Sequence, residues 1–507
     1  METSDRTEDL HPEEERMSAG EVKQRAVTGA AVDVLRGIGV RSIGLIGTLV
    51  LARLLTPHDF GVVAFGATLV TFANFLADGG IGSGLIRRIE PPTRDDLRAL
   101  MAFQLVLSSA LAVLISLPLL PFGTAGEVVA VMTLALPLTA IRAPGVILLE
   151  RQLSYRPLAL VEIVESILYY GWAILLVLSG WGVWGLATAS IVRAGAGSFV
   201  LLLRFSGARI SPRFSFERVK PLLGFGLKYQ AVGVTNLLRD QGTNAAIALC
   251  AGVSALGVWS VAFRILQVPL LFLGSLWRVS FPGMSRLVAT QGDVGATIER
   301  ILGVVAVAAG LMLAPLVAAT PALVPALFGD QWDAVVPVIP PACLHLMVMG
   351  SISVALLGYL WAMGEAGAVL RATLVGIPLM FAVMIPLLLV IGVPAVGFGW
   401  LASGVGEATV LILTARKYVV FRTWSLLVPP TVFATIAAAA GWMLSAESDD
   451  TVLAGLGGAV LAGVVYLVAL LAFHRTHLVD CLRLFMRGTR NMMKRPELSP
   501  RAPVGEM

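Results

Sequence analysis

The feature that most constrains this chain is a series of about fourteen long apolar runs separated by short polar connections. Each run exceeds the roughly 20 residues that a helix needs to cross the hydrocarbon core of a bilayer. None shows the alternating polarity of a strand in a membrane β-barrel. Backbone groups in lipid must be hydrogen-bonded within their own segment, so the runs are predicted to be helices. The runs are residues 29–53, 59–79, 97–119, 126–148, 158–180, 182–204, 222–251, 256–281, 300–328, 336–362, 365–391, 393–415, 424–444 and 452–473.

The composition indicates that lipid is the solvent of this chain. Hydrophobic residues make up 57% of the 507 residues, and charged residues make up only 14%. A soluble domain carries about 25% charged residues. We therefore expect an all-α polytopic membrane protein with about fourteen transmembrane helices.

The basic residues of the connections predict the orientation. With a cytoplasmic N-terminus, the even-numbered connections are cytoplasmic, and the odd-numbered ones hold no Lys or Arg apart from Arg53 at the edge of the first. This asymmetry is the positive-inside rule, and it predicts that both termini are cytoplasmic. The basic balance of the chain therefore reflects topology and not nucleic-acid binding. The even-numbered connections hold Arg87, Arg88, Arg94, Arg151, Arg156, Arg209, Arg213, Arg218, Lys220, Arg286, Arg300, Arg416, Lys417 and Arg422.

One short polar interruption between the first two runs has the chemistry of a helix start. In "LARLLTPHDFGVVAFG", which occupies Leu51–Gly66, Thr56 can cap a helix and Pro57 suits its first turn. Asp59 stands at the third helical position, which completes a capping-box arrangement. Gly61 then permits close packing of another helix. We expect one helix to end at this interruption and an antiparallel helix to begin at once.

The same pattern partly recurs later in the chain, in "IALCAGVSALGVWSVAF". Gly257 stands 196 positions after Gly61, and Ser254 is placed to cap the second helix as Thr56 caps the first. This separation is close to six helices, so it predicts two six-helix lobes, as in transporters built from repeats. The expected parts are a cytoplasmic N-terminal tail (1–28), an N-lobe (29–205), a cytoplasmic inter-lobe loop (206–221), a C-lobe (222–415), two further helices (424–473) and a cytoplasmic C-terminal tail (474–507).

Several stretches, in order, resemble one family of transporters. "LARLLTPHDFGVVAFG" followed by "DGGIGSGLIRR" is similar to the opening of the flippases that export polysaccharide and O-antigen precursors. These flippases belong to the multidrug/oligosaccharidyl-lipid/polysaccharide superfamily. "ERQLSYRPLALVEIVES", "LGVWSVAFRILQVP", "FPGMSRL" and "LFGDQWDAVVPVI" resemble later connections of the same family. The resemblance covers about residues 25–420.

The resemblance implies a transporter and not an enzyme. Such proteins move a polyprenyl-diphosphate-linked oligosaccharide from the cytoplasmic to the outer leaflet of the cytoplasmic membrane, by alternating access and without a cofactor. The implied partners are the lipid-linked oligosaccharide, membrane lipids and other polysaccharide-assembly proteins, with no nucleic acid. No phosphate-cradling loop is present, so we expect no direct use of ATP. The three cysteines lack metal-binding spacing, and we expect no metal site.

Basic residues within the predicted helices are the candidates for binding the substrate diphosphate, because charge inside a membrane is costly without a role. Arg41 and Arg239 lie near the middle of the first and seventh runs and are nearly equivalent in the repeat. Lys228 shares one face of the seventh helix with Arg239, and Arg36 is a further candidate. The alternative is that these charges pair with Asp33, Asp240 or Glu162, or extend to the membrane surface.

Four acidic residues are candidates for coupling transport to an ion. Glu162 and Glu165 stand one turn apart in the fifth run, Glu407 lies within the twelfth, and Asp240 follows Arg239. The alternative is that these carboxylates form structural ion pairs or helix caps.

Two other functions stay open at this point. A drug or small-cation exporter of the same superfamily would need a cavity dominated by acidic groups. The charged residues near the middle of the predicted helices are instead more basic than acidic. A membrane enzyme of the same pathway, a polymerase or ligase, would be expected to carry a large outer loop. Every predicted outer connection has about ten residues or fewer, which argues against an outer active site.

Overall fold

The computed structural model describes residues 19–88, 90–204, 210–290, 292–448 and 451–473, and every regular element in these ranges is a helix. The all-α class expected from the sequence is therefore confirmed. The helices are α1 (Ala19–Leu54), α2 (Pro57–Asp78), α3 (Ile81–Arg87), α4 (Arg94–Leu119), η2 (Leu120–Phe122), α5 (Thr124–Thr133), α6 (Ala135–Arg151), α7 (Tyr155–Leu176), η3 (Val177–Trp181), α8 (Val183–Arg204), α9 (Phe216–Cys250), α10 (Val253–Ala289), α11 (Val294–Phe328), η5 (Asp330–Val338), α12 (Ile339–Ala362), α13 (Ala366–Ile391), α14 (Ala395–Ala415), α15 (Trp424–Glu447) and α16 (Val452–Phe473).

Thirteen helical segments in the described ranges are long and apolar enough to cross a membrane. The remaining long helix is α9, which has 35 residues but is interrupted by polar side chains, among them Lys228, Arg239 and Asp240. With α9, the helices correspond to the about fourteen expected spans. The chain is a multi-pass membrane protein.

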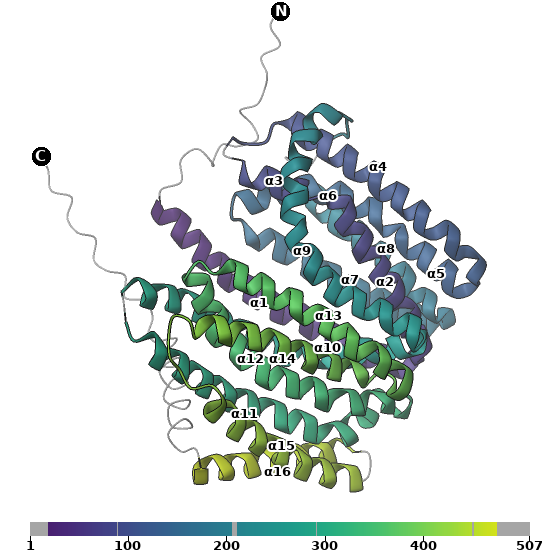
Figure 1. Ribbon diagram of the computed structural model, residues 1–507. Coiled ribbons are helices and arrows are strands. Elements are labelled where there is room, and N and C mark those ends of the chain that lie inside the picture. Colours follow the sequence, from purple (N-terminus) through teal and green to yellow (C-terminus); the bar gives the residue numbers. More distant parts are fainter. Residues whose placement is uncertain (1–18, 89, 205–209, 291, 449–450, 474–507) are drawn as a thin grey trace, which may run out of the picture. The chain divides into compact units, whose positions relative to one another are not determined.

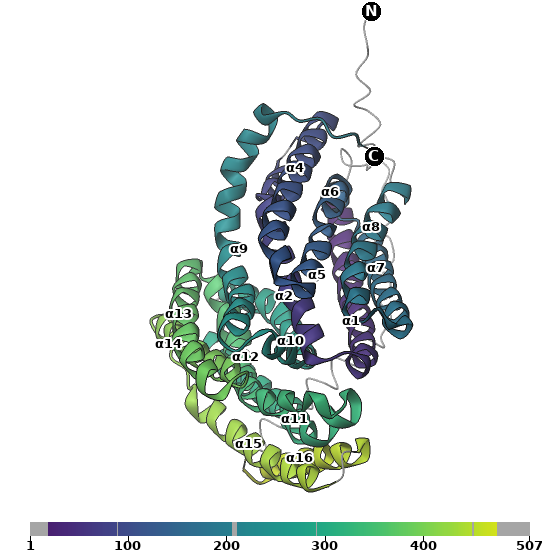
Figure 2. The same ribbon diagram turned by 90° about the vertical axis from the view of Figure 1, so that its right-hand side faces the viewer.

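The chain divides into two compact units, each of which is described here by itself. The first unit comprises Met1–Ile265, Leu327–Val338 and Phe381–Val396, and the second comprises Leu266–Ala326, Ile339–Met380 and Gly397–Met507. In the first unit α7 and α8 lie side by side, and α1 packs along α7 (Figures 1 and 2). On the other side of this unit α9 packs against α2, α3 and α4. The boundaries of the expected lobes, tails and inter-lobe loop stay predictions.

The polar interruption after α1 is a capped helix start, as the sequence predicts. The Asp59 backbone N–H donates to Thr56 Oγ1 at 3.2 Å, and the Thr56 backbone N–H donates to Asp59 Oδ2 at 3.0 Å. These two bonds form a capping box around Pro57 and satisfy backbone donors at the start of α2. The helix start expected at this interruption is therefore confirmed, and the antiparallel course of the first two spans stays a prediction.

The two related stretches of the sequence meet in the first unit. A Cβ atom added to Gly61 would lie 1.9 Å from the carbonyl oxygen of Val253, and one added to Gly257 would lie 1.8 Å from that of Pro57. The starts of α2 and α10 therefore touch reciprocally, backbone to backbone, through the equivalent glycines. The expected cap at Ser254 is wrong, because α10 begins at Val253 and Ser254 Oγ instead lies 3.4 Å from His58 Nδ1.

The short helix η5 closes the same end of the first unit. The Trp332 side chain is fully buried, and its ring meets that of Phe60 edge to face with 5.1 Å between centroids. Its Nε1–H donates to the Ala52 carbonyl oxygen at 2.9 Å. Asp330 and Asp333 on either side are exposed.

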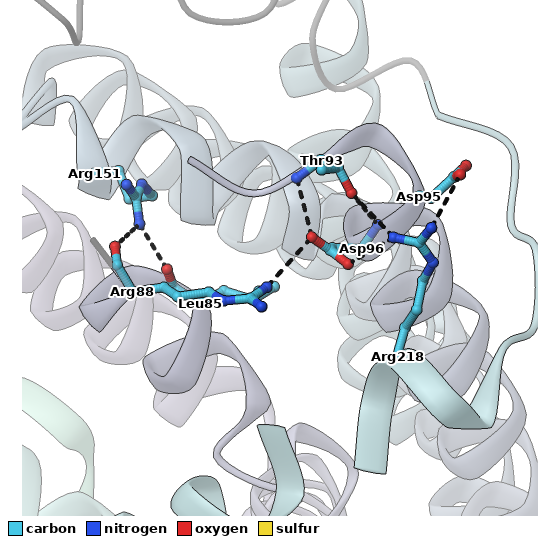
Figure 3. A network of polar contacts seen from close by, with 7 residues as sticks. All are labelled: Leu85, Arg88, Thr93, Asp95, Asp96, Arg151 and Arg218. Atoms are coloured by element: carbon cyan, nitrogen blue, oxygen red, sulfur yellow. Dashed lines mark hydrogen bonds and ion pairs between the residues drawn. The ribbon is translucent and has the colours of Figure 1, made fainter. Parts of the chain in front are cut away.

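At the other end of the first unit, charged side chains join the ends of four helices (Figure 3). Asp96, at the start of α4, accepts from Arg218 at 3.1 Å and lies 3.5 Å from Arg88. Its carboxylate also accepts from the Thr93 backbone N–H, and its own backbone N–H donates to Thr93 Oγ1, which forms a second capping box. Arg151, at the end of α6, donates to the Leu85 and Arg88 carbonyl oxygens at 2.7 Å each. The network satisfies the last carbonyl groups of α3 and links α9 to α4.

The second unit has an apolar core of its own, formed mainly by α10, α11, α12 and α14. Met284, Leu302, Leu356 and Leu411 are among its buried residues. The last two helices, α15 and α16, lie side by side at one edge, next to α11 (Figure 1). They approach closely at Gly441, where an added Cβ would lie 2.3 Å from the Gly458 carbonyl oxygen.

Candidate functional site

Charged residues from five helices of the first unit line one cavity of about 670 Å³. It lies between α1, α2, α6, α7 and α8, towards the end of the unit where α2 ends. We call it the inner cavity. Its charged lining residues are Arg36, Asp78, Arg142, Glu150, Glu162, Glu165 and Arg193.

A second cavity of about 410 Å³, the outer cavity, continues along the same helices towards the start of α2. On α2 the outer cavity is lined from Phe60 to Asn74, whereas the inner cavity is lined from Asn74 to Asp78. The charged residues of the outer cavity are Arg142, Glu165, Arg193 and Arg264. The two cavities share Asn74, Thr139, Arg142, Glu165 and Arg193.

The shared residues centre on Glu165, whose side chain is only 2% exposed. Its Oε1 accepts a hydrogen bond from Arg142 Nη1, and its Oε2 lies 3.6 Å from Arg193 Nε. A Cβ atom added to Gly197 would lie 1.7 Å from Oε1, so the absence of a side chain on α8 leaves the space that the carboxylate fills. We call Arg142, Glu165 and Arg193 the central triad.

A second ion pair lies one helical turn away in the inner cavity. Arg36 Nη1 donates to Glu162 Oε1 at 2.9 Å, which connects α1 to α7. The alternative interpretation, in which this arginine pairs with a carboxylate, is therefore the one observed. Pairing leaves both groups on the cavity wall, where a stronger anion can compete for the guanidinium.

Arg264 differs from these arginines because its partners are neutral. Its Nη1 donates to Thr48 Oγ1 at 2.6 Å and also to the Tyr170 hydroxyl, and its Cζ lies 5.9 Å from the Tyr170 ring centroid. Gly47 on α1 makes room for that ring, since an added Cβ would lie 2.1 Å from it. Within the described ranges, no carboxylate lies at ion-pair distance from Arg264. A half-buried guanidinium with hydroxyl partners keeps its charge available to an anion.

The other cationic candidates lie elsewhere. Arg41 is exposed on α1 and lines neither cavity. Arg239 is half-buried on α9, which packs against α2, α3 and α4, whereas α1 packs along α7. The Lys228 side chain lies outside the described part of the structure. Binding of the substrate diphosphate by Arg41 and Arg239 stays a prediction.

The acidic candidates are also separated. Glu162 and Glu165 line the inner cavity as just described. Glu407, on α14 in the second unit, is largely buried and accepts from Ser403 Oγ at 3.0 Å. Asp240 is exposed on α9. Ion coupling through any of the four stays a prediction.

The sequence analysis missed three arginines that line the cavities. Arg142, Arg193 and Arg264 stand within the predicted runs 126–148, 182–204 and 256–281. The reasoning that singled out Arg41, a charge inside an apolar run, applies equally to them. Metal binding has no support in the part of the chain that the structure describes, where no group of three or more His, Cys, Asp or Glu residues is placed to hold an ion.

Comparison with solved structures identifies the fold. The chain is similar to lipid II flippase MurJ in its inward closed conformation, with a TM-score of 0.67 and 14% sequence identity over 87% of this chain and 99% of that one. It is also similar to an inward-facing multidrug resistance MATE family transporter of the MOP superfamily, with a TM-score of 0.52 and 18% identity over 79% and 98% of the two chains. At these identities, the likeness establishes the fold alone.

Comparison of sequences identifies the family. The chain is 24% identical to the lipopolysaccharide biosynthesis protein WzxC of Escherichia coli (strain K12), over 64% of this chain and 67% of that protein. It is 28% identical to the succinoglycan biosynthesis transport protein ExoT of Rhizobium meliloti (strain 1021), over 66% and 69%. Residues 50–337, more than half of the chain, match the family described as "Polysaccharide biosynthesis protein". The chain is a helical membrane protein with charged cavities, and more than half of it matches this family. It therefore belongs to the polysaccharide biosynthesis protein family.

Proposed function

We propose that this protein is a flippase that moves a polyprenyl-diphosphate-linked oligosaccharide across the cytoplasmic membrane for cell-surface polysaccharide synthesis. A glycan and a diphosphate cannot cross hydrocarbon without a polar route, because desolvation of charged and hydroxyl groups is expensive. The prenyl chain can stay in lipid. Two polar cavities that follow each other along the same membrane helices supply such a route. The proposed activity is transport by alternating access, in which no bond of the substrate is made or broken.

The charge of the outer cavity carries the proposal. Three arginines, Arg142, Arg193 and Arg264, line it together with a single carboxylate, Glu165. The inner cavity is close to balanced, because its arginines face a similar number of carboxylates. An anionic group that enters the inner cavity therefore meets an increasingly positive wall further along the route. This gradient favours a diphosphate and disfavours an organic cation, which argues against the drug-exporter alternative.

Arginine suits this task because its planar guanidinium can form two parallel hydrogen bonds to one phosphate. In our proposal the diphosphate first competes for Arg36 and the central triad, and then reaches Arg264. Arg41 and Arg239, which line neither cavity, stay proposed as further phosphate contacts, and so does Lys228. Glu407 and Asp240 stay proposed for ion coupling.

The positive-inside pattern supports a location in the cytoplasmic membrane with both termini in the cytoplasm. In this orientation the inner cavity is on the cytoplasmic side, where the lipid-linked precursor is made. Relatives named for lipopolysaccharide, succinoglycan and teichuronic acid biosynthesis support a substrate of this class. We further propose that other proteins of polysaccharide assembly act beside the flippase, to supply and remove its substrate.

The test is transport of a fluorescent short-chain prenyl-diphosphate sugar in proteoliposomes. The Arg264→Gln substitution removes a charge-assisted contact worth about 1.5–3 kcal/mol. It should therefore weaken substrate binding roughly 10- to 100-fold. Arg264→Lys should be intermediate, because a point charge replaces the fork. The control is Arg422→Gln, because Arg422 lies in a connection between helices and not in a cavity. Its backbone N–H donates to Glu299, and the substitution leaves that bond in place.

Two results would contradict the proposal. Normal transport by Arg264→Gln would contradict a route through the outer cavity, and transport of organic cations without the diphosphate sugar would favour the drug exporter.

In the parent organism, deletion of the gene should lead to accumulation of a lipid-linked glycan on the cytoplasmic side. A pathway enzyme would instead leave a glycan of altered length.

A further inference from the structure

The central triad joins a buried acid to the two arginines that the proposed substrate needs. Arg142 is on α6, Glu165 on α7 and Arg193 on α8, and the carboxylate engages a different arginine with each oxygen. Its side chain is 2% exposed, whereas that of Arg193 is 52% exposed and faces both cavities. A diphosphate can therefore reach the arginines, but it can bind them fully only by displacing Glu165.

The surroundings of Glu165 offer it no other cation among the described residues. On the inner side, Arg36 from α1 is held by Glu162 at 2.9 Å, and Asp78 from α2 and Glu150 from α6 are both acidic. On the outer side, Tyr169 and Tyr170 from α7 and Arg264 from α10 line the wall, and Arg264 is engaged by Tyr170 and Thr48. Gly197 from α8 contributes no side chain.

Charge balance gives the consequence of displacement. Two guanidinium groups and one carboxylate leave the empty triad with one positive charge. A diphosphate diester carries one negative charge on each phosphate, so its arrival would leave the site with one negative charge and an unpaired buried carboxylate. An uncompensated buried charge is strongly unfavourable, and a carboxylate in this position is neutralised by a proton. With that proton the occupied site is neutral.

We propose that Glu165 is a proton-binding site that is filled when the substrate diphosphate takes over Arg142 and Arg193. Binding of each substrate is then accompanied by uptake of one proton, and release of the substrate returns Glu165 to the arginines and frees that proton. This inference rests on the proposed function and adds a proton that binds together with the substrate and leaves with it. Linkage requires that substrate affinity rise as pH falls, by up to about tenfold per pH unit while Glu165 is ionised in the empty protein.

The experiment measures protons and binding together. Calorimetric titration of the purified full-length protein with a short-chain prenyl-diphosphate sugar, in buffers of different ionisation enthalpy, counts the protons taken up per ligand. The wild type should take up about one proton, by the linkage argument. Glu165→Gln should bind the ligand without proton uptake and with an affinity that no longer depends on pH. Glu299→Gln, in a carboxylate outside the cavities, should behave as the wild type.

The outcomes separate this inference from the proposed function. No binding by the wild type overturns the flippase proposal itself. Binding without proton uptake by the wild type, or uptake that persists in Glu165→Gln, overturns the proton site alone. Because Glu165→Gln can disturb folding, a second measurement uses the wild type only. Infrared difference spectra should gain the C=O band of a protonated carboxyl group when the ligand binds, and absence of that band overturns the inference.

Discussion

Gly197→Ala tests how tightly the structure holds the Glu165 carboxylate. The added Cβ would lie 1.7 Å from Glu165 Oε1 and 2.8 Å from Arg142 Nη1, whereas ordinary contact begins at 3.4 Å. The carboxylate must therefore retreat by about 1.7 Å, which is more than the contact with Arg142 can accommodate. Gly195, two residues earlier on α8, has no atom within 4 Å of its added Cβ and supplies the matched control.

The two variants share every contribution except this contact. Replacement of glycine by alanine in a helix interior stabilises by roughly 1 kcal/mol in both. Gly197→Ala also loses a hydrogen bond to a charged group, worth about 1.5–3 kcal/mol. Gly195→Ala should thus stabilise the protein slightly. Gly197→Ala should be less stable than Gly195→Ala by about 1.5–3 kcal/mol, because only it loses the bond.

Reversible unfolding in mixed micelles, with all variants in one detergent, measures this difference. A Glu165→Ala background provides the internal test. The carboxylate is absent there and the released end of the Arg142 side chain can move aside, so the two alanine variants should become equal. Equal stabilities of the two variants in the otherwise wild-type protein would refute the close approach of Gly197 to Glu165. A difference that persists in the Glu165→Ala background would place its cause elsewhere.

Three further predictions concern topology and stability. A reporter fused after Glu447 should be found outside the cell and one after Arg487 in the cytoplasm, and detection of both on one side would contradict the orientation. Asp96→Asn should destabilise by about 1–3 kcal/mol in denaturant unfolding, because the buried Asp96 carboxylate contacts two arginines. Asp95→Asn should change stability by less than about 1 kcal/mol, because Asp95 is more exposed, and equal effects would contradict this ranking. Trp332→Ala should destabilise by about 3–5 kcal/mol in the same measurement, and a change below 1 kcal/mol would show that η5 is not part of the packed unit.

Structural features that depend only on residues close together in the chain could be predicted from the sequence. The helical spans follow from the length and polarity of each run, and the capping box at Thr56 and Asp59 follows from residue spacing. The close approach at Gly61 was predicted from the small size of glycine, although only the structure identifies its partner as Val253. Even so, the run 126–148 is divided at Leu134 between α5 and α6, a break that hydropathy does not reveal.

The site was harder to predict because it depends on how helices are rotated about their axes. The depth of a residue in the membrane can be predicted from its position within a run. Arg41 became a candidate because it lies near the middle of the first run. The face on which a side chain lies is set by tertiary packing, and this placed Arg142, not Arg41, on the cavity wall. Glu165 could be predicted as a buried acid, but its pairing with residues 23 and 28 positions away requires the arrangement of α6, α7 and α8.

The reciprocal contact between α2 and α10 restricts which substitutions the chain can accept at the start of either helix. Each glycine lies against a backbone carbonyl group of the other helix, and no rotamer change can move a backbone oxygen aside. A larger residue at either position would therefore have to be matched by a shift of the whole opposite helix. Gly61 and Gly257 should therefore be replaced only together with a rearrangement of the facing helix, and glycine should be retained at both positions in functional variants.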